Sequence, residues 1–154
     1  MVIRISAEQV ERIRQLGEKT YPDECCGFLL GQLDGTYKQV LTAVPVANER
    51  EATEKHHRFF IGPDIYRRCE RQARESGMEV LGFYHSHPDA PARPSQYDIE
   101  HAWPWYSYII VSVMKGKSDR LTSWVLQDDR DKLNEEKINL VDSQGTYIWR
   151  TPCP

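Results

Sequence analysis

The order of apolar and polar residues along the chain predicts both helices and strands. From Ser6 to about Gly17, apolar residues recur every three to four positions with charged residues between them, which is the period of an amphipathic helix. Gly62-Pro63 predicts the start of a second helix and Gly77 its end, because proline favours the first helical turn and glycine the C-terminal cap. Apolar runs of strand length lie at residues 22–31, 38–46, 78–84, 105–114 and 121–126.

Polar segments between these runs predict turns and loops. The pair Asp34-Gly35 is a turn signal that joins the first two strands into a hairpin, and residues 115–118 do the same for the last two. Residues 45–57 are polar and predict an irregular loop, with residues 59–61 pairing briefly as a strand. The whole pattern predicts an α/β fold in which helices flank a mixed sheet with mostly antiparallel edges.

The two ends of the chain carry weaker patterns. Residues 2–5 form a short apolar lead before the first helix. Residues 128–136 are densely charged and predict a solvated connector. Apolar residues then alternate with polar ones on both sides of the turn-like segment 142–145. This alternation predicts a C-terminal hairpin extension over residues 131–154.

The bulk composition is typical of one globular domain spanning residues 1–154. Hydrophobic residues make up 40% and charged residues 28%, which is ordinary for such a domain. The net charge of -3 and the absence of a clustered basic stretch exclude the electrostatic footprint of a nucleic-acid-binding protein. No apolar run is long enough to cross a membrane and no signal-peptide pattern opens the chain, so we expect a cytoplasmic protein without a membrane partner.

The cysteines do not form a metal or disulfide framework. They show no Cys-x-x-Cys spacing, and the adjacent pair Cys25-Cys26 suits neither. We expect Cys25, Cys26 and Cys69 to be buried and reduced, and Cys153 to be an exposed free thiol.

Two histidines at the end of an apolar run are the first candidates for chemistry. His85 and His87 follow residues 78–84, and side chains two positions apart in an extended chain point to the same face. Two imidazoles can therefore meet one metal ion. Pro88 ends the strand. His56-His57 is expected to be solvated, because neighbouring side chains diverge in extended structure, with a contact to substrate as the alternative.

The loop after Pro88 leads to a second candidate group. Ser95 can cap a new helix that runs to about Trp103, and Asp98 lies one turn inside it. Ser95-x-x-Asp98 fits a capping box, in which serine and acid bond each other's backbone amides. The Asp98 carboxylate can also turn back toward the histidines. Two imidazoles and one carboxylate make three ligands, the number that a catalytic zinc site uses.

These residues together resemble the signature of the JAMM/MPN+ zinc metalloproteases. The signature reads His-Ser/Thr-His-Pro, six residues, then Ser-x-x-Asp, and residues 85–98 match every fixed position. The resemblance covers about residues 6–126 and is to the compact prokaryotic type. It implies a single JAMM/MPN domain, similar in architecture to the cytidine deaminases. It also implies a zinc ion held by His85, His87 and Asp98.

A glutamate near the N-terminus is selected by the same resemblance. Glu24 borders an apolar segment, where its pKa should be raised, although a solvated loop acid is the simpler interpretation of the residue alone. The stretch Glu-x-Cys-Gly-x-Leu-x-Gly that begins at Glu24 resembles the family segment that carries the catalytic glutamate. The family arrangement brings this segment beside the strand that holds His85. Glu24 is therefore expected to be the general base, and Ser95 to stabilise the oxyanion. Ser86 faces away from the histidines and is expected to play only a supporting role.

The resemblance also implies a substrate class. Family members cleave peptide or isopeptide bonds after the diglycine tail of ubiquitin-like proteins, and compact prokaryotic relatives act on sulfur-carrier proteins of that fold. We expect the extended tail of such a carrier to add to an exposed strand edge. A non-catalytic MPN-type scaffold is the alternative, and a zinc deaminase is disfavoured because its His-x-Glu and Pro-Cys-x-x-Cys signature is absent. The oligomeric state stays open.

Overall fold

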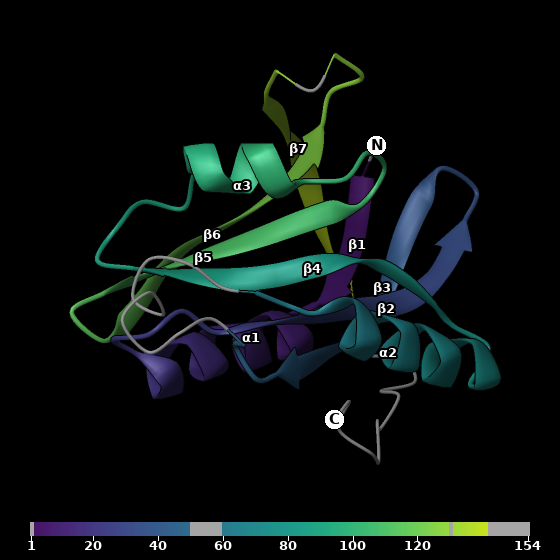
Figure 1. Ribbon diagram of the computed structural model, residues 1–154, viewed down its shortest axis with the longest axis horizontal. Coiled ribbons are helices and arrows are strands. Elements are labelled where there is room, and N and C mark those ends of the chain that lie inside the picture. Colours follow the sequence, from purple (N-terminus) through teal and green to yellow (C-terminus); the bar gives the residue numbers. More distant parts are fainter. Residues whose placement is uncertain (1, 50–59, 130, 142–154) are drawn as a thin grey trace.

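The computed structural model describes residues 2–49, 60–129 and 131–141 (Figure 1). Within these residues the chain forms seven strands and three helices in the order β1 (Val2–Ser6), α1 (Ala7–Thr20), β2 (Cys26–Asp34), β3 (Tyr37–Val46), α2 (Pro63–Glu75), β4 (Glu79–Pro88), α3 (Gln96–His101), β5 (Ser107–Met114), β6 (Lys117–Leu126) and β7 (Leu133–Val141). None of these helices is long and apolar enough to cross a membrane.

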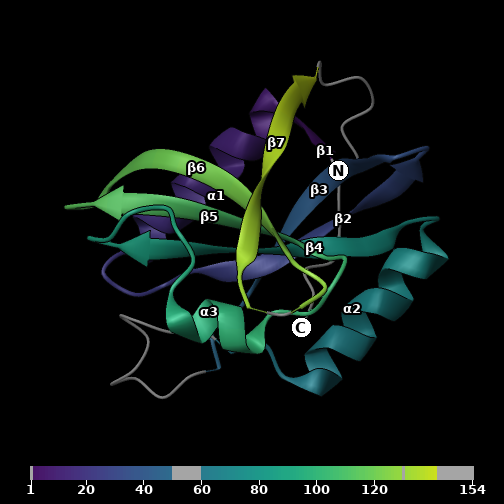
Figure 2. The same ribbon diagram turned by 90° about the horizontal axis from the view of Figure 1, so that it is seen from above.

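The strands form one mixed sheet that closes on itself. The strand order is β1-β3-β2-β4-β5-β6-β7, and β7 returns to pair with β1. The pairs β1–β3, β1–β7 and β4–β5 are parallel, and the other four are antiparallel. Figure 2 shows how strongly the sheet curves. The predicted α/β class and mixed sheet are confirmed. Within the described part of the chain, the sheet has no antiparallel edge strands, because β7 pairs with β1 and closes it into a barrel.

The closing strand comes from the segment that the sequence marked only as an apolar lead. In β1 the side chains of Ile3 and Ile5 are fully buried, whereas their neighbours are partly exposed. This two-residue alternation is the strand period, but five residues are too few to distinguish it from a short hydrophobic lead. β1 joins β3 to β7 and so removes both edges of the sheet.

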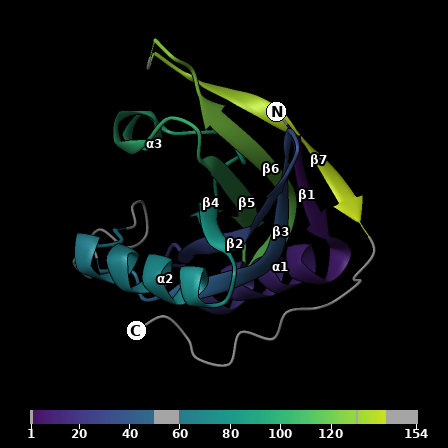
Figure 3. The same cartoon turned by 90° about the vertical axis from the view of Figure 1, so that its right-hand side faces the viewer.

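Two helices cover the sheet from different sides (Figure 3). Ile13 of α1 belongs to a buried cluster with Leu29, whereas Cys69 and Ala73 of α2 pack in another cluster with Phe28. Because successive side chains of β2 enter different clusters, this strand is buried on both faces. The same holds for β4, the strand that carries the two histidines.

Several element boundaries differ from the sequence prediction. α3 ends at His101 rather than near Trp103, and β6 begins at Lys117, inside the predicted turn. Phe60 and Ile61 belong to no strand, although the Phe60 carbonyl accepts a hydrogen bond from Glu49 N–H at 3.0 Å. The helix predicted from Gly62-Pro63 and the other four predicted strands, which correspond to β2, β3, β4 and β5, are confirmed.

The largest difference is β7, which begins inside the predicted charged connector. Glu135 and Lys137 are exposed, but Glu136 between them is buried and accepts a hydrogen bond from Ser123 Oγ at 2.7 Å. In a sequence, a buried and hydrogen-bonded glutamate cannot be told from a solvated one. The charged residues therefore made the first part of β7 look like a connector, whereas its second part lies in the predicted hairpin extension. The turn predicted at residues 142–145, and the predictions for His56, His57 and Cys153, fall outside the described residues.

Two glycines, Gly27 and Gly31, let β2 approach its neighbouring strands closely. A Cβ added at Gly31 would lie 1.9 Å from the carbonyl oxygen of Gln39 on β3. At Gly27 the added atom would lie 2.3 Å from the Val44 carbonyl oxygen and 2.4 Å from the Tyr84 ring. Any side chain at these positions would therefore force β2 away from its neighbours.

We predict that Gly31→Ala destabilises the protein by about 1–3 kcal/mol or more, because the new methyl group overlaps backbone that cannot rotate away. Urea unfolding followed by circular dichroism measures the change. Leu33→Ala is the control on the same strand, since Leu33 is 47% exposed and its loss should change stability by about 0.5 kcal/mol or less. Equal stability of Gly31→Ala and the unmodified protein would contradict the close approach.

Candidate metal centre

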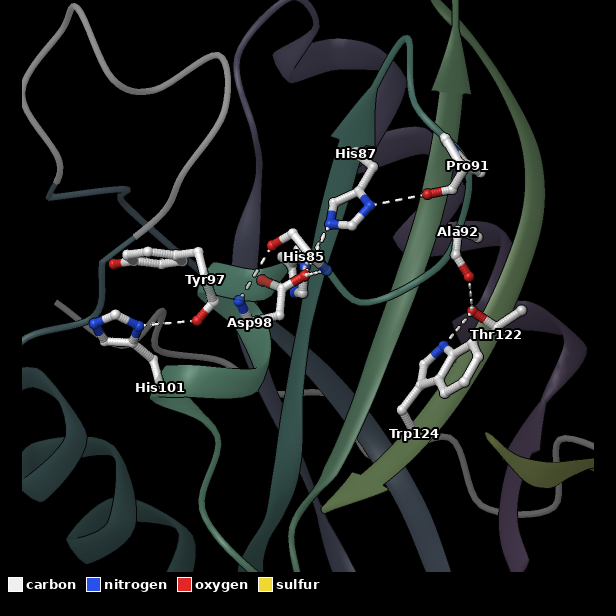
Figure 4. Close-up of polar contacts among 10 residues, drawn as sticks. His85, His87, Pro91, Ala92, Tyr97, Asp98, His101, Thr122 and Trp124 are labelled. Carbon is white, nitrogen blue, oxygen red and sulfur yellow. Dashed lines mark hydrogen bonds and ion pairs between the residues drawn. The ribbon is translucent and has the colours of Figure 1, made fainter. Parts of the chain in front are cut away.

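β4 delivers both histidines to one buried point. The strand lies between β2 and β5, and His85 and His87 are 1% and 8% exposed. Both project from the same face, as the two-residue spacing predicts (Figure 4). Their rings are 4.9 Å apart between centroids, and the two Nε2 atoms are separated by 3.0 Å.

Asp98 completes a triangle with the two imidazoles. Its Oδ2 atom lies 3.1 Å from His87 Nε2 and 3.3 Å from His85 Nε2. Ligand atoms arranged tetrahedrally at about 2.0–2.2 Å from a zinc ion are about 3.3–3.6 Å apart. The triangle is only slightly tighter than this, so the three side chains fit a zinc ion after a small outward shift.

Asp98 reaches this position through the helix cap. The Asp98 amide donates to Ser95 Oγ at 3.1 Å, and Asp98 Oδ2 accepts from the Ser95 amide at 2.9 Å. Both hydrogen bonds of a capping box are therefore present. The same Oδ2 atom faces the histidines, so capping and ligation are compatible uses of one carboxylate.

The electrostatics of the triangle keep Asp98 ionised and shift the pKa values of the two imidazoles in opposite directions. Burial alone would raise the pKa of Asp98, but the charges and hydrogen bonds of His85 and His87 outweigh it and hold that pKa well below its usual range. Burial lowers the pKa of His85. Burial also acts to lower the pKa of His87, but the hydrogen bond and charge of Asp98 raise it overall. An ionised aspartate and imidazole lone pairs are the forms that bind metals.

Glu24 lies beside the triangle, just before β2. It is 2% exposed, and burial is the main cause that raises its pKa to about 8. One ligand atom each from Glu24, His85 and His87 lies within 4.8 Å of the others. Asp98 is in direct contact with both histidines and is therefore the better third ligand, which leaves Glu24 next to the triangle. Glu24 Oε2 has no hydrogen-bond partner among the described residues.

Ser86 fixes the backbone next to Glu24. Its hydroxyl accepts a hydrogen bond from the Cys25 amide at 2.8 Å, and its own amide donates to the Cys25 carbonyl at 3.1 Å. Its side chain is fully buried on the side away from the histidines, next to Gly17 of α1. The sequence predicted this orientation, and the structure shows that the supporting contact joins β4 to the Glu24 segment.

The sequence did not identify the contacts made through backbone carbonyls. His87 Nδ1 lies 2.9 Å from the Pro91 carbonyl oxygen, and Asn48 Nδ2 donates to the Glu24 carbonyl at 3.3 Å. A carbonyl acceptor can come from any residue type, so no spacing marks it. Ser95 is exposed, and its hydroxyl, which accepts from Asp98, keeps its own proton to donate.

The closed barrel and its buried cluster of two imidazoles and two carboxylates define a single-domain protein built around a candidate metal site. Residues 6–127 match the family model described as prokaryotic homologs of the JAB domain. The match covers most of the chain, so the protein belongs to this family, the compact prokaryotic type of JAMM/MPN protein.

Curated relatives and solved structures agree with this membership. The chain is 37% identical over 92 residues to a desampylase of Haloferax volcanii, in a match that spans 59% of this chain and 63% of that protein. It is 28% identical over 115 residues to a desampylase of Pyrococcus furiosus, covering 75% and 74% of the two chains.

Solved structures show the same fold. A protein of Desulfitobacterium hafniense has a TM-score of 0.78 at 30% identity, covering 92% of this chain and 94% of its own. One from Salinibacter ruber has a TM-score of 0.71 at 38% identity, covering 92% of each chain. A JAB1/MPN domain protein from Archaeoglobus fulgidus, at 20% identity and a TM-score of 0.53, covers 90% of this chain and 98% of its own.

The buried thiols next to Glu24 should be unreactive. Cys25 is buried, and burial raises its pKa to about 11, so its thiolate fraction at neutral pH is roughly a hundredfold below that of an ordinary thiol. Burial also raises the pKa of Cys26. We predict that iodoacetamide labels both cysteines at least about a hundredfold more slowly in the native protein than in urea, measured by mass spectrometry of peptides. Rapid native labelling of Cys25 would indicate a reactive thiol and contradict this prediction.

Proposed function

We propose that the protein is a zinc-dependent peptidase or isopeptidase. It hydrolyses the bond that follows the diglycine tail of a ubiquitin-like or sulfur-carrier protein. The observation that carries the proposal is the triangle of His85, His87 and Asp98, with separations of 3.0–3.3 Å, beside the buried Glu24. His85 Nε2, His87 Nε2 and Asp98 Oδ2 would hold the metal. When bound, a zinc ion supplies a Lewis acid that acidifies water and polarises a carbonyl.

Glu24 is the general base in this proposal. Its carboxylate takes a proton from the attacking water and returns it to the departing amine. Burial in the apolar wall beside Cys25 raises the pKa of Glu24 to about 8, so the carboxyl group can hold a proton near neutral pH between these two transfers. The backbone contacts of Ser86 keep Glu24 in register with the histidines.

Ser95 is proposed to stabilise the oxyanion. It lies at the exposed start of α3, and its amide is 2.9 Å from the same Asp98 oxygen that faces the histidines. Its hydroxyl proton is therefore close to the place where substrate charge would develop. A donor of this kind contributes roughly 10²–10³ in turnover in other hydrolases.

The substrate proposal rests on the family and on the enzyme names of two relatives. A glycine at the scissile position suits a buried centre, because it adds no side chain next to the two shielded imidazoles. β4 pairs with β2 on one side as far as His85, and with β5 on the other side as far as Pro88. The tail therefore cannot add to this strand at His85, and we expect it to approach past the loop at residues 88–94 and α3.

A non-catalytic scaffold is the competing proposal. A buried carboxylate such as Glu24, whose Oε2 lacks a partner among the described residues, costs free energy of folding that a scaffold has no reason to retain. The complete ligand triangle argues in the same direction.

The first prediction concerns the metal. The purified protein should carry one zinc ion per chain, and His85→Ala or Asp98→Ala should lose it while the barrel stays folded, because each removes one corner of the triangle. Elemental analysis and circular dichroism give the two readouts. His101→Ala is the control, since this histidine is exposed and its hydrogen bond among the described residues stays within α3, to the Tyr97 carbonyl. Full zinc content in His85→Ala would overturn the ligand assignment.

The second prediction separates proton transfer from metal binding. Glu24→Gln should keep zinc and lose roughly 10²–10⁴ in turnover, because the amide has the same shape but cannot accept the proton. Glu136→Gln is the matched control, another buried glutamate that bonds Ser123 on β6 rather than facing the histidines. If Glu24→Gln loses zinc, Glu24 is a ligand. If it stays fully active, Glu24 is not the base.

The third prediction tests the substrate class. Zinc-loaded protein should cleave a ubiquitin-like carrier fusion directly after its Gly-Gly end, and changing the last glycine to alanine should slow cleavage strongly without changing zinc content. Cleavage is mapped by mass spectrometry, with casein as the unfolded control substrate. Ready digestion of casein, or cleavage at another bond, would show that the proposed specificity is wrong.

A further inference from the structure

The orientation of the His87 ring is set by a backbone carbonyl in the loop at residues 88–94. His87 Nδ1 lies 2.9 Å from the carbonyl oxygen of Pro91, which can only accept (Figure 4). The ring must therefore carry a proton on Nδ1. When Nε2 carries no second proton, as in a metal-bound imidazole, its lone pair faces the point that Asp98 Oδ2 and His85 Nε2 share, and this is the tautomer that a metal ligand requires.

The carbonyls on either side of Pro91 are held from two neighbouring strands. Ser112 of β5, which pairs in register with His87, donates its hydroxyl to the Ala90 carbonyl at 2.6 Å. Thr122 of β6 donates to the Ala92 carbonyl at 2.7 Å. Three consecutive carbonyls of the loop thus accept hydrogen bonds from three different side chains.

A third side chain fixes the direction of the Thr122 bond. Trp124 Nε1 donates to Thr122 Oγ1 at 2.8 Å. An indole nitrogen can only donate, so the threonine oxygen accepts there and must direct its own proton toward Ala92. The two hydrogen bonds therefore run in the same donor-to-acceptor direction, from Trp124 to Thr122 and from Thr122 to Ala92. Hydrogen bonds linked in this way strengthen each other.

Hydrogen bonds help to hold this part of the loop, together with the buried side chain of Ala92. A cavity of about 390 Å³ borders Pro91 and Ala92 together with Ser112, Thr122 and Trp124, so side chains fill only part of the space against the loop. Ser112 and Thr122 are 3% and 6% exposed, and burying such hydroxyls is costly unless they are bonded. Their hydrogen bonds to Ala90 and Ala92 satisfy them.

We propose that Ser112, Thr122 and Trp124 are positioning residues of the metal centre. They hold the Pro91 carbonyl where it selects the Nδ1–H tautomer of His87, and their side-chain hydrogen bonds in the described part of the chain go to the loop and to each other, not to the ligand atoms. The proposal rests on the proposed function only in that the triangle binds a metal. Outer contacts of this kind typically change metal affinity or activity by about 10–100-fold.

The experiment compares Thr122→Val, which keeps the side-chain shape and removes the hydroxyl, with the double variant Ser112→Ala/Thr122→Val. Zinc affinity is measured by competition with a chromophoric chelator. We expect a loss of about 10–100-fold, larger in the double variant, with all three ligands present. Thr122→Ser, which retains the hydroxyl, should restore most of the affinity.

Ser123→Ala is the matched control. Ser123 is the next residue on β6, and its hydroxyl bonds Glu136 instead of the loop. The variant removes a buried hydroxyl and should leave zinc affinity unchanged. If it weakens affinity as much as Thr122→Val does, general destabilisation explains the effect and the positioning role is wrong.

A second readout does not depend on metal. At a pH high enough for His87 to be neutral, the ¹⁵N chemical shifts of its ring in metal-free protein should report the Nδ1–H tautomer in the unmodified chain and a mixture of tautomers in the double variant. Unchanged shifts, together with zinc affinities within about twofold, would overturn the proposal. If the unmodified protein binds no zinc, the proposed function fails, and the tautomer shift alone decides whether the three residues position His87.

Discussion

The structure depends on the pairing of β2 with β4. This pairing places Cys26 opposite His85, and so brings Glu24, two residues earlier in the chain, beside the imidazoles. The two Ser86–Cys25 hydrogen bonds extend the contact past the end of β2. Gly27 and Gly31 are required by the same packing, because a side chain at either would push β2 away from β3 or β4.

Burial at this junction determines the charge states of the site. It raises the pKa of Glu24 and lowers that of His85, so both groups favour their neutral forms, whereas Asp98 stays ionised through its contacts with the histidines. The cluster thus presents the neutral His85 imidazole and the Asp98 carboxylate at one point, beside His87, whose pKa the carboxylate raises. An added cation would complete the charge balance there, which is why the site suits a metal better than an uncompensated polar core.

Local spacing was sufficient to predict much of the site, and long-range contacts were not predictable in this way. His85 and His87 share a face because of the strand period, and Ser95 and Asp98 meet because of helix capping, so both pairs follow from positions close in sequence. Glu24 is one of 23 acidic residues, and only the family resemblance selected it. The two histidines that lie next to Glu24 in space, His85 and His87, are about sixty positions further along the chain. The adjacent hydrogen bond between Cys25 and Ser86 spans a similar separation.

The closure of the barrel was missed for a related reason. β1 shows only two buried side chains, and β7 carries charges on its exposed side together with a buried, hydrogen-bonded Glu136. β1 and the first part of β7 lack the hydrophobic pattern of an isolated strand, and both strands are stabilised by pairing with each other and with β3 and β6. The carbonyl contacts of Ser112 and Thr122 likewise depend on the folded loop and not on residue spacing.

The most direct test of the central claim is a crystal structure of the zinc-loaded protein with anomalous data collected at the zinc edge. The account predicts one peak, about 2.0–2.2 Å from His85 Nε2, His87 Nε2 and Asp98 Oδ2, with Glu24 outside the coordination sphere. A peak coordinated by Glu24 in place of Asp98, by a cysteine sulfur at about 2.3 Å, or lying away from the triangle would contradict it.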